Sequence, residues 1–151
     1  MIRLNLSTDY ALRTLLYLAG NPERQSSCRE VAEFYAISGD HVAKVVQHLA
    51  HAGMVRAGRG RGGGLRLGRP AERITVGEVV ELFEGPVALL ECVSHEGVCR
   101  IQPGCRLRAL LDDAGARLMA ELRAVTLADL GGPPTAPLIQ LQPLLAGRDA
   151  E

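Results

Sequence analysis

Aromatic residues are scarce in this chain, and tryptophan is absent: three tyrosines and two phenylalanines make up 3% of its 151 residues. The core therefore has to be built from aliphatic and small side chains. No run of 18 apolar residues occurs, which excludes a membrane-spanning helix. The first ten residues lack a basic region followed by an apolar run, so we expect no secretory signal and a cytoplasmic location.

The chain also has no net charge, but its charges are unevenly distributed. Residues 1–70 carry ten Arg and Lys against five Asp and Glu, a net charge of +5. Residues 71–151 carry seven against twelve, a net charge of −5. A basic first half indicates a polyanionic partner, the alternative being a chance scatter of surface charge.

Helix signals occupy the start of the chain. Apolar residues at helical spacing predict a helix over 6–19, with Ser7 as its N-cap and Gly20 at its end. Ser27 and Glu30 have the spacing of a capping box, which predicts a second helix directly after Ser27.

A third helix is predicted over 39–51, with Ser38 as its N-cap. It carries the apolar stripe of an amphipathic helix, formed by Val42, Val45, Val46 and Leu49. Only a short turn separates it from the helix before it. The pair is therefore a candidate helix-turn-helix motif, although helical bundles contain similar pairs.

A glycine-rich segment follows the third helix. Residues 58–64 contain five glycines and lie between two short strand-like runs, 54–57 and 65–67. This layout predicts a hairpin, and a basic hairpin after a helix-turn-helix is the layout of a winged helix. The segment also matches G-x-G-x-x-G, but a dinucleotide-binding loop should open a helix, and here a strand pattern follows.

These elements suggest which residues contact DNA. The N-terminal residues of a recognition helix approach base edges, and the arginines of a wing approach phosphates or the minor groove. The alternative for each is a solvated surface side chain. The candidates are Ser38, Gly39, Asp40, His41 and Lys44 in the helix, and Arg56, Arg59 and Arg61 in the hairpin.

The second half begins with a predicted helix over 75–83, followed by a loop. A longer helix is predicted over 105–125, where apolar residues recur every three or four positions. We interpret it as a dimerisation helix, with a core helix of a single subunit as the alternative. The tail from 131 is rich in proline and is expected to be extended or mobile.

Three of the four cysteines, Cys92, Cys99 and Cys105, fall within 14 residues. In a cytosolic chain such a cluster indicates metal binding or redox chemistry. The spacing is not that of a zinc ribbon or a bacterial ferredoxin, but three thiolates can hold part of an iron–sulfur cluster. The residues leave open a fourth ligand from His95, Cys28 or a carboxylate. Separate buried cysteines and structural zinc also remain open.

Three stretches together carry a resemblance to a known family. They are residues 6–13 (Leu-Ser-Thr-Asp-Tyr-Ala-Leu-Arg), residues 59–65 (Arg-Gly-Arg-Gly-Gly-Gly-Leu), and the cysteine segment from Glu91-Cys92 through Cys99 to Cys105-Arg-Leu-Arg108. Over roughly residues 3–130 the chain resembles the NsrR/IscR family of bacterial winged-helix regulators that carry an iron–sulfur cluster. Within that family it looks most similar to the NsrR-like members, which sense nitric oxide.

The resemblance implies a homodimer with the cluster near the subunit interface. IscR-like members, which hold [2Fe–2S], have a histidine three residues after the third cysteine, where this chain has Arg108. NsrR-like members can use three cysteines and an aspartate from the first helix of the partner subunit. Asp9 occupies the matching position. One departure is the six residues between Cys92 and Cys99, against five in several relatives.

The sequence therefore predicts a mainly α fold with a small β-hairpin. It comprises a winged helix-turn-helix domain over 1–84, a cluster-binding loop over 85–104, a dimerisation helix over 105–130 and an extended or mobile tail over 131–151. No nucleophile–base pair is present, so we do not expect an enzyme.

The predicted function is repression of transcription on a double-stranded DNA operator. Cys92, Cys99, Cys105 and Asp9 of the partner subunit would hold a [4Fe–4S] cluster, with His95 as the reserve ligand. Nitrosylation of the cluster would release the dimer from DNA. The alternatives are a [2Fe–2S] sensor of redox or cluster status, a zinc or thiol-switch DNA-binding protein, and an electron-transfer protein.

Overall fold

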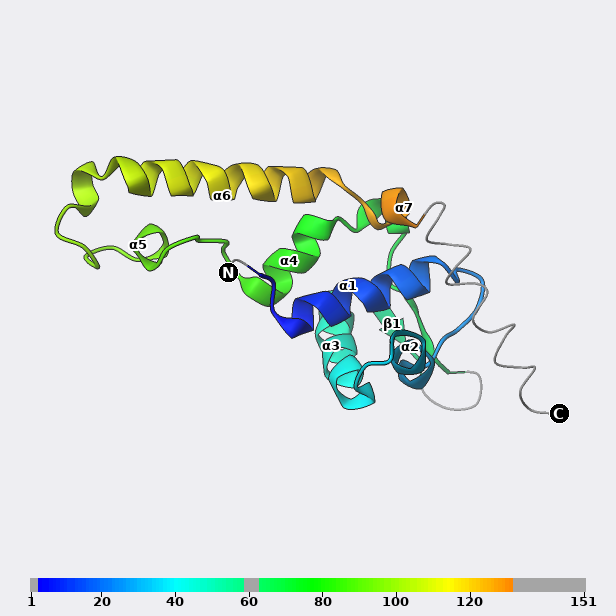
Figure 1. Ribbon diagram of the computed structural model, residues 1–151. Coiled ribbons are helices and arrows are strands. Elements are labelled where there is room, and N and C mark those ends of the chain that lie inside the picture. Colours follow the sequence, from blue (N-terminus) through cyan, green and yellow to red (C-terminus); the bar gives the residue numbers. More distant parts are fainter. Residues whose placement is uncertain (1–2, 59–62, 132–151) are drawn as a thin grey trace.

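The computed structural model describes residues 3–58 and 63–131. The expected class, a mainly α fold with a small antiparallel hairpin, is confirmed. Figure 1 shows α4 lying between α1 and the long α6, whose far end extends past the other helices toward α5. In chain order the elements are α1 (Leu6–Ala19), α2 (Cys28–Tyr35), α3 (Gly39–His51), β1 (Val55–Ala57), β2 (Leu65–Leu67), α4 (Val76–Glu84), α5 (Glu91–Ser94), α6 (Arg106–Ala124) and α7 (Leu127–Leu130), with 3₁₀ turns at Ala71–Arg73 and Gln102–Gly104.

Helix α1 has the predicted range but a different cap. Asn5, not Ser7, is the N-cap, and its side chain accepts a hydrogen bond from the backbone N–H of Thr8 at 2.8 Å. The backbone N–H of Asn5 donates to Glu84 at the end of α4, at 2.7 Å. The prediction of Ser7 was wrong because a contact 79 residues away along the chain selects the residue at which α1 begins.

Helices α2 and α3 form the expected pair. The capping box is present: Ser27 accepts from the N–H of Glu30 at 3.1 Å, and Glu30 accepts from the N–H of Ser27 at 2.5 Å. Ala36 adopts the left-handed conformation (φ 52°) that turns the chain, and Ser38 caps α3 as predicted.

The core of this domain is aliphatic, as the composition requires. The stripe on α3 is buried, and it packs with Ala11, Leu15 and Leu18 of α1. Each fully buried Val or Leu side chain contributes about 1.5–3 kcal/mol relative to exposure, so these contacts hold α3 in place. Tyr17 is the one aromatic side chain that is fully buried among the described residues.

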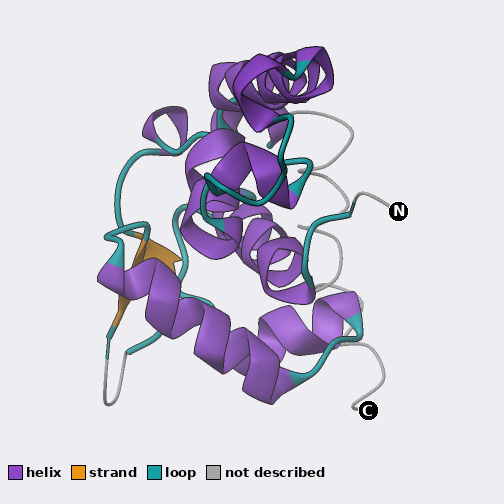
Figure 2. Cartoon of the chain, turned by 90° about the vertical axis from the view of Figure 1, so that its left-hand side faces the viewer, coloured by secondary structure: helices purple, strands orange, loops and turns teal. Residues whose placement is uncertain are grey.

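The hairpin pairs β1 with β2 in antiparallel register, with Arg56 opposite Arg66. The hairpin has a further backbone partner that the sequence did not predict. Ser26 exchanges two backbone hydrogen bonds with Leu65 of β2, at 3.0 and 2.6 Å. Gly68 lies so close to the end of α3 that a Cβ there would be 2.9 Å from the carbonyl carbon of Gly53. Figure 2 shows the two strands at one edge of the molecule.

Helix α6 ends at Ala124, and the chain then returns to the winged domain. Thr126 bridges to Thr75, and the N–H of Leu127 donates to Ile74 at 2.9 Å. Leu127 is fully buried in the core of the first domain. The helix predicted over 105–125 therefore ends at Ala124, and the rest of the segment to 130 contains the separate short helix α7, because burying Leu127 requires a break after α6. Residues 132–151, nearly all of the predicted tail, lie outside the described residues.

Among the residues that the structure describes, no helix is both long enough and apolar enough to cross a bilayer.

Candidate functional site

The start of α3 presents the predicted recognition residues to solvent. Ser38, Gly39, Asp40, His41 and Lys44 are all exposed. They lie off the buried stripe, because helical periodicity places that stripe on the face toward α1. The ring centroid of His41 lies 5.9 Å from that of Tyr10, so α1 supports the side chain from one side.

The hairpin adds positive charge beside this helix. Arg56 and Arg66 are cross-strand neighbours, and both are exposed. Like charges opposite one another are unfavourable within a hairpin and become favourable when an anion lies between them. The sequence places Arg66, like Arg56, among the arginines of the predicted wing. Arg59 and Arg61 lie outside the described residues.

The cysteine loop, which we define as residues 91–105, connects the winged domain to α6. Cys92 lies on α5 and is half-buried, Cys99 is exposed, and Cys105 is the half-buried N-cap of α6. All three are free thiols. Within residues 3–58 and 63–131 no three His, Cys, Asp or Glu side chains lie close enough together to hold a metal ion. The donor chemistry fits an iron–sulfur cluster, but one chain alone does not bring the donors together.

Asp9 lies in the first turn of α1, as predicted, and it already has a partner. Its carboxylate accepts from Nε of Arg13 at 2.8 Å, and the side chains are 42% and 41% exposed. This hydrogen bond raises the pKa of Arg13. The guanidinium also lies 5.7 Å from the ring centroid of Tyr35. A metal ion bound to Asp9 would therefore compete with Arg13 for the carboxylate.

The other predicted ligands differ in position. His95 ends α5, is exposed, and has Nδ1 2.9 Å from the hydroxyl of Ser94. Cys28 begins α2, where burial raises the pKa of its thiol. It packs against the winged-domain core. His95 is thus in the cysteine loop and Cys28 is not.

Gln102 is a residue of this region that sequence reasoning missed. Its side chain is buried in the cysteine loop and makes three hydrogen bonds there. A glutamine in a Gly- and Pro-containing segment gives no local signal of burial, since the partners are backbone groups five to ten residues earlier.

Helix α6 divides its apolar residues between two faces. Met119 is buried against α4, and Leu111 and Leu122 are half-buried. Leu107, Leu110 and Leu118 form an exposed apolar flank, at 55%, 63% and 43% exposure. The apolar residues that recur along this helix are therefore divided: some contact the rest of the chain, and the others remain on an open surface.

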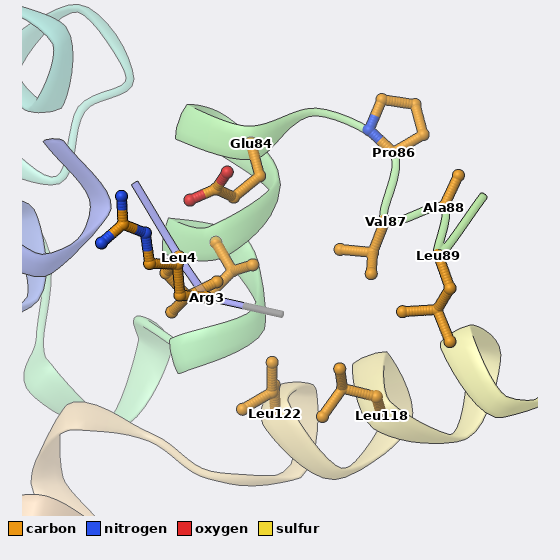
Figure 3. Close-up of a pocket in the computed structure, with 10 residues that line it drawn as sticks. Arg3, Leu4, Glu84, Pro86, Val87, Ala88, Leu89, Leu118 and Leu122 are labelled. Atoms are coloured by element: carbon orange, nitrogen blue, oxygen red, sulfur yellow. The ribbon is translucent and has the colours of Figure 1, made fainter. Parts of the chain in front are cut away.

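A groove of about 560 Å³ lies beside this flank, between the N-terminal segment, α4, residues 86–89 and α6. Figure 3 shows Leu118 and Leu122 of α6 on one side of it and Val87 and Leu89 on another, with Arg3 and Glu84 at its edge. Its walls are mostly apolar, as in a surface that another apolar element covers.

A helix-turn-helix with an exposed, polar recognition face and an arginine-bearing hairpin defines a winged-helix DNA-binding protein. A family model described as Rrf2, iron-dependent transcriptional regulator, matches residues 4–132. The chain belongs to the Rrf2 family. It is therefore a transcriptional regulator and not an enzyme, and regulators of this family bind DNA and are typically dimeric.

Solved structures agree with this membership. CymR (YrzC), the global cysteine regulator of B. subtilis, is 26% identical with a TM-score of 0.72, over 87% of this chain and 97% of that chain. The oxidized form of Staphylococcus aureus CymR is 27% identical with a TM-score of 0.65, over 86% and 96%. T. potens IscR, at 22% identity and a TM-score of 0.69 over 85% of each chain, has the same fold.

Proposed function

We propose that this protein is a homodimeric repressor that holds an iron–sulfur cluster through Cys92, Cys99 and Cys105 and leaves its operator when nitric oxide attacks that cluster. The observation that carries the proposal is the position of the three thiols. They lie in one loop that connects the winged domain to the helix with the exposed apolar flank.

Dimerisation is supported by the apolar flank of α6 and the groove beside it. Three leucines at 43–63% exposure on one helix would lower solubility in a monomer, and a second copy of α6 would cover them. Two recognition helices in such a dimer would have to fit half-sites about 34–36 Å apart, one turn of DNA.

The fourth ligand is proposed to be Asp9 of the partner subunit, with His95 in reserve. An oxygen ligand binds iron less firmly than a thiolate does, so the iron it holds is the accessible one. When bound, the cluster supplies iron centres with which nitric oxide reacts. Arg13 would retain Asp9 whenever that ligand position is empty, because the two side chains are already paired at 2.8 Å.

The chain itself connects the loop to the DNA-binding surface. Cys105 is the N-cap of α6, so a rearranged loop displaces the start of that helix. Helix α6 packs on α4, and α4 packs on α1, which contacts α3. A change in α6 therefore alters the spacing between the two α3 helices of a dimer, and weaker operator binding follows.

The test is an absorbance spectrum with iron, sulfide and zinc analysis of the full chain purified without oxygen, followed by nitric oxide titration. We expect near four irons and four sulfides per chain, a broad visible band that nitric oxide bleaches, and a simultaneous loss of binding to an operator selected from random duplexes. Two irons per chain would replace nitric oxide sensing with redox or cluster-status sensing. Zinc, or no metal, would reject the cluster.

A thiol-based regulator is the second candidate, and two observations favour it. All three cysteines of the loop are free thiols, and Cys99 is exposed. The similar structures include a global cysteine regulator and an oxidized CymR. In that case the metal-free protein would bind the operator, and a mild thiol oxidant would weaken binding in the wild type but not in Cys99→Ala.

A further inference from the structure

The cysteine loop has little apolar packing of its own. Within residues 91–105, all of which the structure describes, Gln102 is the one buried residue, at 7% exposure. Cys99 and its neighbours Val98 and Arg100 are exposed. Hydrogen bonds, and not a hydrophobic core, therefore define the path of this loop.

The side chain of Gln102 supplies three of these bonds. Its amide nitrogen donates to the carbonyl oxygens of Cys92 at 2.7 Å and His95 at 2.6 Å. Its amide oxygen accepts from the N–H of Gly97 at 2.7 Å. Gly97 has φ +78°, a conformation that side chains disfavour. Both N–H donors and the acceptor of one amide are thus used in a single turn of the loop.

The backbone of Gln102 contacts the other two cysteines. Its N–H donates to the carbonyl oxygen of Cys99 at 3.2 Å, and its own carbonyl accepts from the N–H of Cys105 at 3.4 Å. Each of the three cysteines is therefore one hydrogen bond away from Gln102. Any residue at this position can make the two backbone bonds, but no isosteric residue reproduces the three side-chain bonds, because Glu lacks the two donors and Met has no donor and only a weak acceptor.

The geometry points to Gln102 as the positioning residue of the cysteine loop: it sets the backbone positions from which Cys92, Cys99 and Cys105 present their thiols. The inference rests on the proposed function in one respect, the identity of the bound group as an iron–sulfur cluster. Gln102 itself is no ligand; it acts through the backbone of residues that are.

The experiment compares the full-length wild type with Gln102→Met, which keeps the length of the side chain and removes its hydrogen bonds. Ser94→Ala is the matched control. It removes both side-chain hydrogen bonds of Ser94 in the same loop, to the carbonyl of Glu91 at 3.1 Å and with Nδ1 of His95 at 2.9 Å, and neither partner is a cysteine. Three measurements are made: amide exchange of the metal-free protein, iron per chain after anaerobic reconstitution, and the visible circular dichroism of the cluster.

In Gln102→Met we expect the Gly97 amide to exchange about tenfold faster or more. Iron per chain should fall several-fold, and the dichroism of any cluster that forms should change shape. The control should match the wild type in all three measurements, and both variants should keep the melting temperature of the winged domain. Gln102→Glu retains the acceptor for Gly97, so it should protect that amide and still load iron poorly.

Faster exchange with normal iron content and an unchanged dichroism band would make Gln102 a merely structural residue and overturn the inference. Failure of the proposed function looks different, because the wild type itself would then take up no cluster. In that event the inference is tested by the relative alkylation rates of the three thiols in the metal-free protein. A pattern altered by Gln102→Met but not by Ser94→Ala supports positioning, and identical patterns overturn it.

Discussion

At the scale of single residues, one missing side chain sets how closely α4 approaches α6. A Cβ on Gly77 would lie 2.8 Å from the backbone nitrogen of Arg123 and 3.0 Å from its Cα. Arg123 is held there by an ion pair with Glu81 of α4. Backbone atoms cannot move aside as the end of a flexible side chain can, so the contact tolerates glycine alone.

Gly77→Ala should therefore destabilise the fold by about 1–3 kcal/mol, the usual cost of overpacking, despite the better helix propensity of alanine. Urea unfolding followed by circular dichroism measures the change. Gly39→Ala is the control: a Cβ there meets only Ala32 Cβ at 3.9 Å, so its stability should equal or slightly exceed that of the wild type. Equal stability of the two variants would refute the close-contact argument.

A second prediction at the scale of residues concerns Arg56, which is exposed on β1 directly opposite Arg66 and is a candidate phosphate contact. Arg56→Ala should weaken binding to duplexes of any sequence, and should reduce the slope of log K against log salt by about 1, because one phosphate contact is lost. Arg117→Ala, on α6 and outside the winged domain, removes the same charge and should leave the slope unchanged. Arg61→Ala is predicted to behave like Arg56→Ala.

At the scale of elements, capping boxes define where α2, α4 and α7 begin. In α2, burial opposes the ionisation of Glu30, but hydrogen bonds from Ser27 and Arg24 outweigh it and lower the pKa of Glu30 below its ordinary 4.5. A carboxyl group with a lowered pKa in the folded state stabilises the fold above its unfolded pKa. That stabilisation disappears as the pH falls through the folded value.

Glu30→Ala should cost about 1 kcal/mol at neutral pH, the typical value of a lost cap. The difference from the wild type should shrink once the pH drops below 4.5, as the wild-type carboxylate becomes protonated. Unfolding curves at several pH values measure it. Glu33→Ala in the same helix removes only an exposed ion pair with Arg29 and should change stability by a few tenths of a kcal/mol at most. A cost for Glu30→Ala that is constant with pH would contradict the assignment.

At the scale of the whole molecule, α6 has one face packed on its own chain and another that is exposed. Met119 packs against α4, Gly115 lies close to the carbonyl of Val87, and the apolar flank of Leu107, Leu110 and Leu118 remains exposed. The flank continues into the groove beside it, because Leu118 lines both. A second copy of the chain is the proposed occupant.

Leu110→Asp should raise the dissociation constant of the dimer by about a hundredfold or more, because a carboxylate would be buried without a partner. Light scattering coupled to size-exclusion chromatography over a range of concentrations measures it. Ala116→Asp places the same charge on the polar face of α6 and should leave a dimer. A dimer that survives Leu110→Asp would place the interface elsewhere.

The sequence by itself determined the elements whose signals are local. Ser27 with Glu30, Ser38, and the stripe on α3 each act within one or two helical turns, so the helix-turn-helix was predicted within a residue of its bounds. The two strands of the hairpin followed from the glycine-rich segment between them. The exposure of the recognition residues followed from helical periodicity.

Only the tertiary structure decided features that depend on distant partners. Glu84 selects Asn5 as the cap of α1, and the core takes up Leu127, which returns the chain after α6 to the winged domain. Packing on α4 buries some of the apolar residues of α6 and leaves the others exposed on a second face. Gln102 connects the cysteines through backbone groups that sequence spacing does not reveal. The physical reason is common to all four: a buried polar or apolar group is stabilised only by what surrounds it, and folding alone brings those surroundings together.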